Sequence, residues 1–165
     1  MTLARPTLRF LLSHPAHFIA LGFGAGLAPV APGTFGTLVA IPIAFALRAY
    51  LPDALFLAAV VVFLALGVWA AAVTGRDLGV PDHGAIVWDE VVAFLLVLYF
   101  VGDDAVGVAF AFLLFRVFDI VKPWPAGACE KIAGGWGVML DDLVAGIYAN
   151  VALRAAIFAW AAIRG

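Results

Sequence analysis

The sequence predicts an all-α fold: a polytopic membrane helical bundle with four to five spanning helices plus an N-terminal interfacial or re-entrant helix. Hydrophobic residues make up 66% of the 165 residues and charged residues only 12%, against roughly 45–50% and about 25% in ordinary globular proteins. A soluble chain of this length has too much surface to keep so many apolar side chains from water. We therefore expect one membrane-embedded domain over residues 1–165.

The N-terminal segment, residues 1–27, is expected to remain on the protein. Two arginines precede an apolar run, as in a secretory signal. His14, Pro15 and His17 interrupt that run. We therefore favour a retained helix that lies at the membrane surface or dips into it.

Four or five apolar segments follow, and a spanning helix needs about 20 residues. The second segment meets this length unaided, whereas the third does so only if Asp89 and Glu90 lie inside the helix. Burying two carboxylates there costs free energy unless they face a hydrated or metal-filled cavity. The segments are 36–51, 54–73, 85–101, 105–121 and about 141–163.

The connections predict an orientation. Short turns alternate with long polar stretches, and alternating helices place all of the long stretches on one membrane face. Four basic residues lie on that face and two near the other, which places the long stretches in the cytoplasm. The long stretches are 28–37, 74–90 and 116–142, and their basic residues are Arg76, Arg116, Lys122 and Lys131.

The first polar stretch, APVAPGTFGT at 28–37, is expected to be a turn that ends at a helix starting near residue 35. Gly33 permits an unusual backbone angle there, and Thr34 is placed to cap the helix. Exposed N–H groups at the helix start, with the hydroxyls of Thr34 and Thr37, could receive an anion. An ordinary capped turn is the alternative.

The second stretch, 74–90, contains the turn sequence Pro-Asp-His-Gly with Asp82 and His83. Asp89 and Glu90 follow at the start of an apolar helix. The helix dipole favours acids at that position, but it does not require two adjacent carboxylates at the edge of a membrane. We expect Asp89 or Glu90 to be functional, and His83 to serve the turn or the substrate.

The third and fourth stretches add charges of both signs. Arg116, Asp119 and Lys122 are spaced so that neighbours share a helix face, although snorkelling at the interface is an alternative. In GGWGVMLDDLVAG, 134–146, glycines loosen the chain ahead of a helix entered by Asp141 and Asp142. Consecutive side chains point about 100° apart on a helix, so one acid could ligate while the other orients it.

Together these stretches place six carboxylates and several basic residues at one membrane face. The carboxylates repel unless cations neutralise them, and hard oxygen ligands favour Mg²⁺, with Mn²⁺ as an alternative. The basic residues would then bind an anionic group such as phosphate. No basic tail points to nucleic acid, and no obligate protein partner is evident.

Other hydrolytic chemistries lack their residues. Cys129 is not followed by the arginine of a cysteine phosphatase loop, and no serine–histidine–acid arrangement suited to a membrane hydrolase is evident around the single serine, Ser13. Only His83 lies in a polar motif, so a histidine nucleophile lacks its partner. Water activated by a metal, or a carboxylate nucleophile, remains, and we favour water.

The motifs PGTFGT, DHGAIVWDE, FRVFDIVKPWP and GGWGVMLDDLVAG resemble those of the phosphatidylglycerophosphatase A family. The resemblance runs from about residue 22 to 150. It implies a Mg²⁺-dependent enzyme of the bacterial inner membrane that hydrolyses phosphatidylglycerophosphate, an anionic phospholipid, to phosphatidylglycerol and phosphate. Position 85, where such sequences often carry a small hydroxyl residue, is Ala85 here.

The working hypothesis places the catalytic motifs within 28–150 and the site on the cytoplasmic side. An ion or proton transporter and a non-catalytic lipid-binding subunit are the alternatives. The expected metal ligands are Asp89, Glu90, Asp141 and Asp142. The expected catalytic residues are Asp82, Asp119 and Glu90, and the expected phosphate-binding residues are Arg116, Lys122, Lys131, Thr34, Thr37 and His83.

Overall fold

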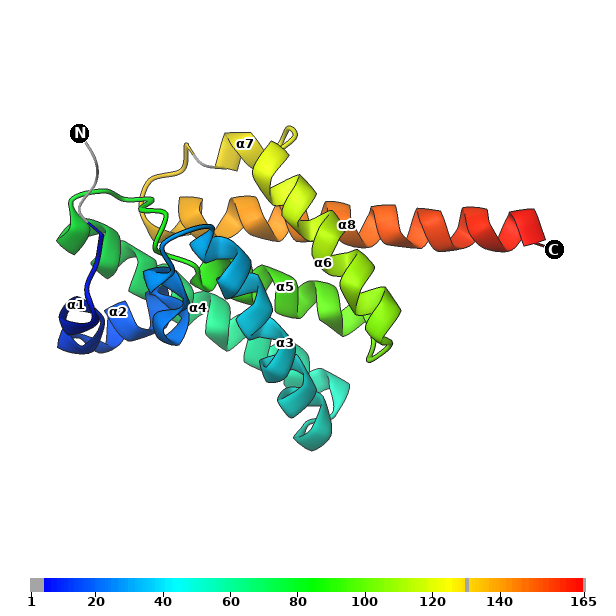
Figure 1. Cartoon of the computed structure of the whole chain (residues 1–165), viewed down its shortest axis with the longest axis horizontal. Helices are drawn as coiled ribbons and strands as arrows, with labels where there is room; N and C mark the ends of the chain where they lie inside the picture. The colour runs from blue at the N-terminus through cyan, green and yellow to red at the C-terminus, as the bar shows by residue number, and fades with distance from the viewer. Residues whose placement is uncertain (1–4, 130, 165) are drawn as a thin grey trace.

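The computed structural model describes residues 5–129 and 131–164, and every regular element in these ranges is a helix (Figure 1). The predicted all-α class is therefore confirmed for the described residues, while residues 1–4 of the predicted N-terminal segment lie outside them. The elements are α1 (Leu8–Ser13), α2 (Pro15–Ala20), η1 (Gly22–Leu27), α3 (Pro32–Tyr50), α4 (Asp53–Leu78), α5 (Trp88–Val101), α6 (Ala105–Val121), α7 (Ala126–Cys129) and α8 (Gly135–Arg164).

Three helices, α3, α4 and α8, are long and apolar enough to cross a membrane. The predicted segments 85–101 and 105–121 form α5 and α6, which have 14 and 17 residues. At about 1.5 Å per residue, both are shorter than the roughly 30 Å hydrocarbon core. Helix α8 is the longest, and its C-terminal half extends beyond the rest of the molecule (Figure 1).

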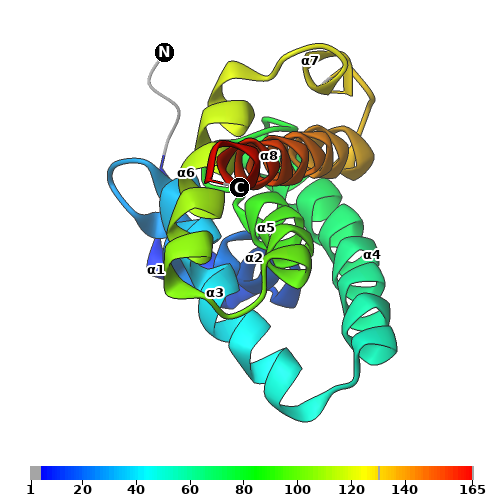
Figure 2. The same cartoon turned by 90° about the vertical axis from the view of Figure 1, so that its right-hand side faces the viewer.

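Helix α5 is the centre of the bundle. It packs against α3, α4, α6 and α8, which surround it when the molecule is viewed along α8 (Figure 2). Almost every side chain from Val91 to Leu98 is buried. A helix that is apolar on all sides is stable only when other helices or lipid cover it, and here other helices do so.

Two helices begin earlier than the sequence predicts. Helix α3 starts at Pro32 rather than near residue 35, and the capping position is Ala31 in a left-handed conformation (φ 48°). The prediction that Thr34 caps this helix is therefore wrong. Proline is well suited to the first helical position because its missing N–H would have no intrahelical partner there. Helix α8 starts at Gly135, so two of the glycines expected to loosen the chain lie inside the helix.

The helical glycines allow close approach between elements. A Cβ atom on Gly135 would lie 2.0 Å from the carbonyl oxygen of Val68 in α4, and one on Gly36 would lie 2.8 Å from that of Val87. Small residues at such contacts let neighbouring backbones come together. The glycines therefore hold α8 against α4, and α3 against the start of α5.

The N-terminal segment forms three short pieces that pack on the long helices. Helix α2 lies along α4, and Nε2 of the buried His17 lies 3.1 Å from Oδ2 of Asp77 near the end of α4. None of the described pieces is long enough to cross a bilayer.

The contact at Gly135 predicts a stability effect. We expect Gly135→Ala to lower the free energy of unfolding by about 1–3 kcal/mol, as overpacking does, because the contacting atom belongs to rigid backbone. Thermal unfolding of the detergent-solubilised protein measures this change. Gly84→Ala is the matched control, because a Cβ there meets nothing within 4 Å. Equal unfolding temperatures for the two variants would show that α8 and α4 are not held this closely.

Candidate metal and phosphate site

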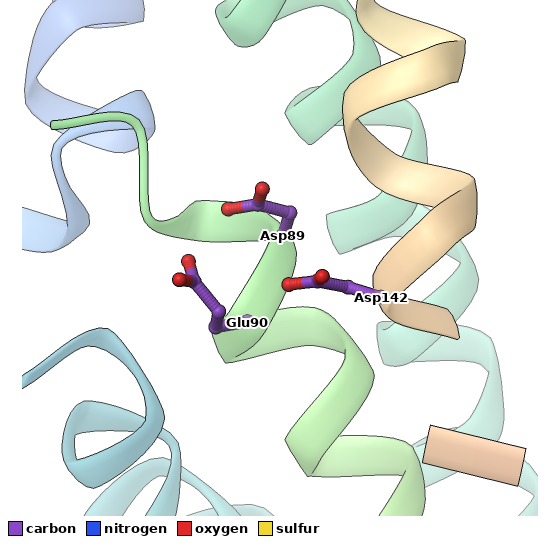
Figure 3. A group of neighbouring side chains, drawn as sticks. All are labelled: Asp89, Glu90 and Asp142. Atoms are coloured by element: carbon purple, nitrogen blue, oxygen red, sulfur yellow. The ribbon is translucent and has the colours of Figure 1, made fainter. Parts of the chain in front are cut away.

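Three carboxylates converge where α5 meets α8. Asp89 and Glu90 lie in the first turn of α5, and Asp142 reaches toward them from α8 (Figure 3). One oxygen from each lies within 4.8 Å of the others. Three of the four predicted metal ligands are therefore brought together.

The sequence of α5 explains how two acids come to lie inside an apolar bundle. The helix is short and starts at Trp88, whose Nε1 donates to the carbonyl oxygen of Phe63 in α4 at 2.9 Å. Its first turn therefore lies among the other helices. The positive end of the helix dipole stabilises negative charge at Asp89 and Glu90.

The three carboxylates have oxygens without partners. Oδ1 of Asp89, Oε2 of Glu90 and Oδ2 of Asp142 are buried and accept no hydrogen bond from any described residue. A buried charged group without a partner costs several kcal/mol, and like charges this close repel. Convergent, unpaired carboxylate oxygens are the donor set that Mg²⁺ prefers, so the residues present fit such an ion.

Arg116 and Asp119 from α6 form one wall of the cluster. Nη1 of Arg116 lies 2.6 Å from Oδ2 of Asp119 and 3.5 Å from Oε1 of Glu90. Nη1 also lies 3.4 Å from the hydroxyl of Thr37, which donates to the carbonyl oxygen of Gly33 at 2.9 Å. One guanidinium thus joins helices α3, α5 and α6.

Asp141 and Lys122 form a second ion pair beside the cluster. The ammonium group of Lys122 pairs with Oδ2 of Asp141, and the backbone N–H of Asp142 donates to Oδ1 of Asp141 at 3.0 Å. The two adjacent acids point in different directions, as the 100° helical step requires. Asp142 faces the carboxylate cluster, whereas Asp141 lies beside it and holds Lys122 in place.

Gly33 is required by the cluster rather than by its own backbone angle. It lies in the first turn of α3, so the predicted unusual conformation is absent at this residue and belongs to its neighbour Ala31. A Cβ on Gly33 would lie 1.9 Å from Oε1 of Glu90 and 3.2 Å from Nη1 of Arg116. Only glycine lets α3 approach these groups so closely.

The structure does not bring every predicted residue to the centre. Thr34 is half-buried in the first turn of α3. Asp82 is exposed and, with Lys131, lines a neighbouring cavity of about 250 Å³, although it is close enough to Asp141 for their charges to repel. His83 lies at a different cavity, where its Nδ1 accepts a hydrogen bond from the N–H of Ala85 at 3.1 Å.

The fold also brings together a serine, a histidine and an aspartate that the sequence motifs do not include. Ser13 Oγ lies 3.2 Å from Nδ1 of His17, whose Nε2 faces Asp77. The arrangement has the order of a hydrolytic triad, but Ser13 Oγ donates to the carbonyl oxygen of Phe10 at 2.7 Å. It therefore fastens α1 and α2 to α4. Helical spacing relates Ser13 to His17, but no local pattern points to Asp77, 60 positions further along the chain.

Comparison with known proteins gives consistent matches. The family model for phosphatidylglycerophosphatase A matches residues 18–157. Proteins named phosphatidylglycerophosphatase A from Escherichia coli and Haemophilus influenzae are 42% and 40% identical, with 84% and 94% of this chain and 81% and 96% of theirs covered. A putative phosphatidylinositol-3-phosphatase from Bacteroides thetaiotaomicron is 41% identical over 84% of this chain and 91% of its own.

No solved structure shows a significant match to the chain. The family match covers all four polar motifs and every residue of the carboxylate cluster. Together with the length over which the relatives align, this shows that the chain belongs to the phosphatidylglycerophosphatase A family and is a phosphoric monoester hydrolase.

Proposed function

We propose that the protein is a Mg²⁺-dependent lipid phosphatase that hydrolyses phosphatidylglycerophosphate to phosphatidylglycerol and phosphate. The names of the Escherichia coli and Haemophilus influenzae relatives support this substrate. The observation that carries the chemistry is the group of buried carboxylate oxygens of Asp89, Glu90 and Asp142, which no described residue pairs.

In this proposal Asp89, Glu90 and Asp142 hold the metal, and Asp141 supports them from the side. Mn²⁺ has similar ligand preferences and is the alternative ion. When bound, the ion lowers the pKa of a water molecule and offsets negative charge on the phosphate oxygens.

Arg116 and Lys122, which both pair with acids of this region, would bind the phosphate. Arg116 is oriented by Asp119 and Lys122 by Asp141, so neither side chain has to be ordered when substrate arrives. Such fixed charges stabilise a phosphoryl transition state more effectively than mobile ones. We assign further contacts with the phosphate to Thr34 and Thr37 in α3. We assign another to Lys131, which lines a cavity together with Asp82.

The reaction needs an acceptor for one proton. A water oxygen bonds to phosphorus as the bond from phosphorus to the glycerol oxygen breaks. The water gives up one proton, and the leaving glycerol oxygen takes up one proton from solvent. Asp82 is exposed and close enough to Asp141 for their charges to interact, so its carboxylate would accept the proton of the attacking water and exchange it with solvent.

For the membrane arrangement, we propose that α5 and α6 complete a bundle of four to five transmembrane segments with α3, α4 and α8. The short α1 and α2 would lie at the interface, and the carboxylate cluster would face the cytoplasm. A transporter would distribute its acids through the depth of the membrane. The acids of α5, α6 and α8 instead gather at one end of these helices, whereas Asp103 and Asp104 lie in the turn between α5 and α6 at the other end.

The carboxylate cluster gives the first prediction of activity. Glu90→Gln and Asp142→Asn should each lower Mg²⁺-dependent phosphate release by roughly 10²–10³-fold, the range for removing one group that stabilises transition-state charge. Asp103→Asn is the control, because Asp103 pairs with Arg48 at the opposite turn. Release of phosphate by the purified protein, with and without Mg²⁺, measures the effect. Full activity in both cluster variants would rule out this cage, and no release from wild type would favour a lipid-binding subunit.

Metal binding should also be visible without turnover. Saturating Mg²⁺ should raise the thermal midpoint of the wild type, because a ligand at 100 times its dissociation constant stabilises the native state by about 2.7 kcal/mol. Asp89→Asn should raise the metal-free midpoint, since it removes one repelling charge, and should weaken the response to Mg²⁺. A metal-free midpoint below that of the wild type would contradict the proposed repulsion.

The orientation can be tested at the single cysteine of the chain. Cys129 is partly exposed in α7, on the side of the long polar stretches. A membrane-impermeant maleimide should label it in inside-out vesicles and leave it unlabelled in intact spheroplasts, with Cys129→Ser as the background control. Labelling in spheroplasts alone would place the site on the periplasmic side.

A further inference from the structure

A second cavity lies next to the carboxylate cluster and is not used by the proposed hydrolysis. It has a volume of about 150 Å³ and adjoins the start of α3. The residues that line it come from the N-terminal segment, from the turn before α3 and from the turn before α5. They include Arg5, Pro6, Ala28, Pro32, His83 and Gly84.

His83 lines this cavity and carries an unpaired donor atom. Its side chain is only 7% exposed, and its Nδ1 accepts the N–H of Ala85. A neutral histidine that accepts at Nδ1 carries its proton at Nε2. The Nε2 atom is buried and has no hydrogen-bond partner among the described residues. A buried donor in this state favours a ligand that brings an acceptor oxygen.

The charges around the cavity select an anion. Arg5 supplies a full positive charge, and Pro32 is the first residue of the 19-residue α3, whose N-terminal end carries about half a positive charge. No carboxylate is found among the described residues that line the cavity. Helix N-termini with unpaired donors nearby bind phosphate groups in many proteins.

The cavity and the carboxylate cluster share a wall. Pro32 lines the cavity, while the next residue, Gly33, contacts Glu90 and Arg116. Consecutive Cα atoms are about 3.8 Å apart, so a single turn of α3 separates the two places. Phosphatidylglycerophosphate has two phosphates, a terminal monoester and an internal diester, joined by one glycerol unit.

We propose that this cavity binds the phosphodiester of the lipid headgroup while the carboxylate cluster acts on the terminal monoester. The inference rests on the proposed function and assigns Arg5 and the Nε2–H of His83 as contacts to the diester oxygens. These residues select lipids that carry both phosphates and take no part in breaking the bond.

The two products of the reaction test the two places separately. Phosphatidylglycerol carries only the diester, and inorganic phosphate resembles only the monoester. We would measure both as inhibitors of phosphatidylglycerophosphate hydrolysis in mixed detergent micelles. His83→Asn removes the Nε2–H, and the shorter side chain keeps an oxygen that can accept the N–H of Ala85. Arg5→Gln removes an exposed charge and does not threaten folding.

We expect each variant to raise the inhibition constant of phosphatidylglycerol about tenfold, as the loss of one charge-assisted hydrogen bond does, and to leave that of phosphate unchanged. Arg9→Gln is the matched control, because Arg9 is an exposed cation of the same segment that does not line the cavity. Equal effects of Arg5→Gln and Arg9→Gln would show general attraction to anionic lipid and overturn the site.

The diester site would also be overturned if the variants left the inhibition constant of phosphatidylglycerol unchanged, or raised the inhibition constants of both products equally. If wild type does not hydrolyse phosphatidylglycerophosphate at all, the proposed function fails and this inference fails with it. If wild type hydrolyses the lipid but the variants show no selective rise in the inhibition constant of phosphatidylglycerol, only the diester site is refuted.

Discussion

Repulsion among buried carboxylates determines how tightly the helices around them must pack. Five acids meet at one end of the bundle, and Arg116 and Lys122 are the basic side chains that pair with them among the described residues. Charges in a low-dielectric interior are costly unless they are compensated, so the helices must hold the acids in place against their repulsion. The five are Asp89, Glu90, Asp119, Asp141 and Asp142.

The helical scaffold provides that restraint through packing. Helix α5 is enclosed by four others. Gly36 brings α3 close to the backbone of Val87, and Gly135 brings α8 close to the backbone of Val68 in α4. Interiors packed this closely are hard to compress, so one helix cannot move without moving its neighbours. The acids are therefore fixed by helix contacts outside the cluster as well as within it, and fixed charges are the condition for a preorganised centre.

The sequence predicts the helical class, the polar motifs and the acids because composition and spacing are local properties. It does not predict that α5 has only 14 residues, since its apolar run continues upstream through residues 85–87, which lie outside the helix and pack against the N-terminal segment. It misplaces the starts of α3 and α8 because Gly33 and Gly135 are read as flexible, whereas close contacts from distant residues require them. Helical spacing predicts that Asp141 and Asp142 point in different directions. It does not predict which groups they meet, because those groups lie on other elements.

Helix α3 shows how these levels combine. It contributes no acid to the cluster, yet Gly33 touches Glu90 and Thr37 touches Arg116, so its first turn closes the carboxylate site on one side. On its other side the same turn forms the wall of the cavity that contains His83. A shift of this turn would therefore change both proposed anion sites together. In the proposed reaction this couples recognition of the lipid headgroup to the position of the phosphate that is removed, because one rigid turn sets the distance between them.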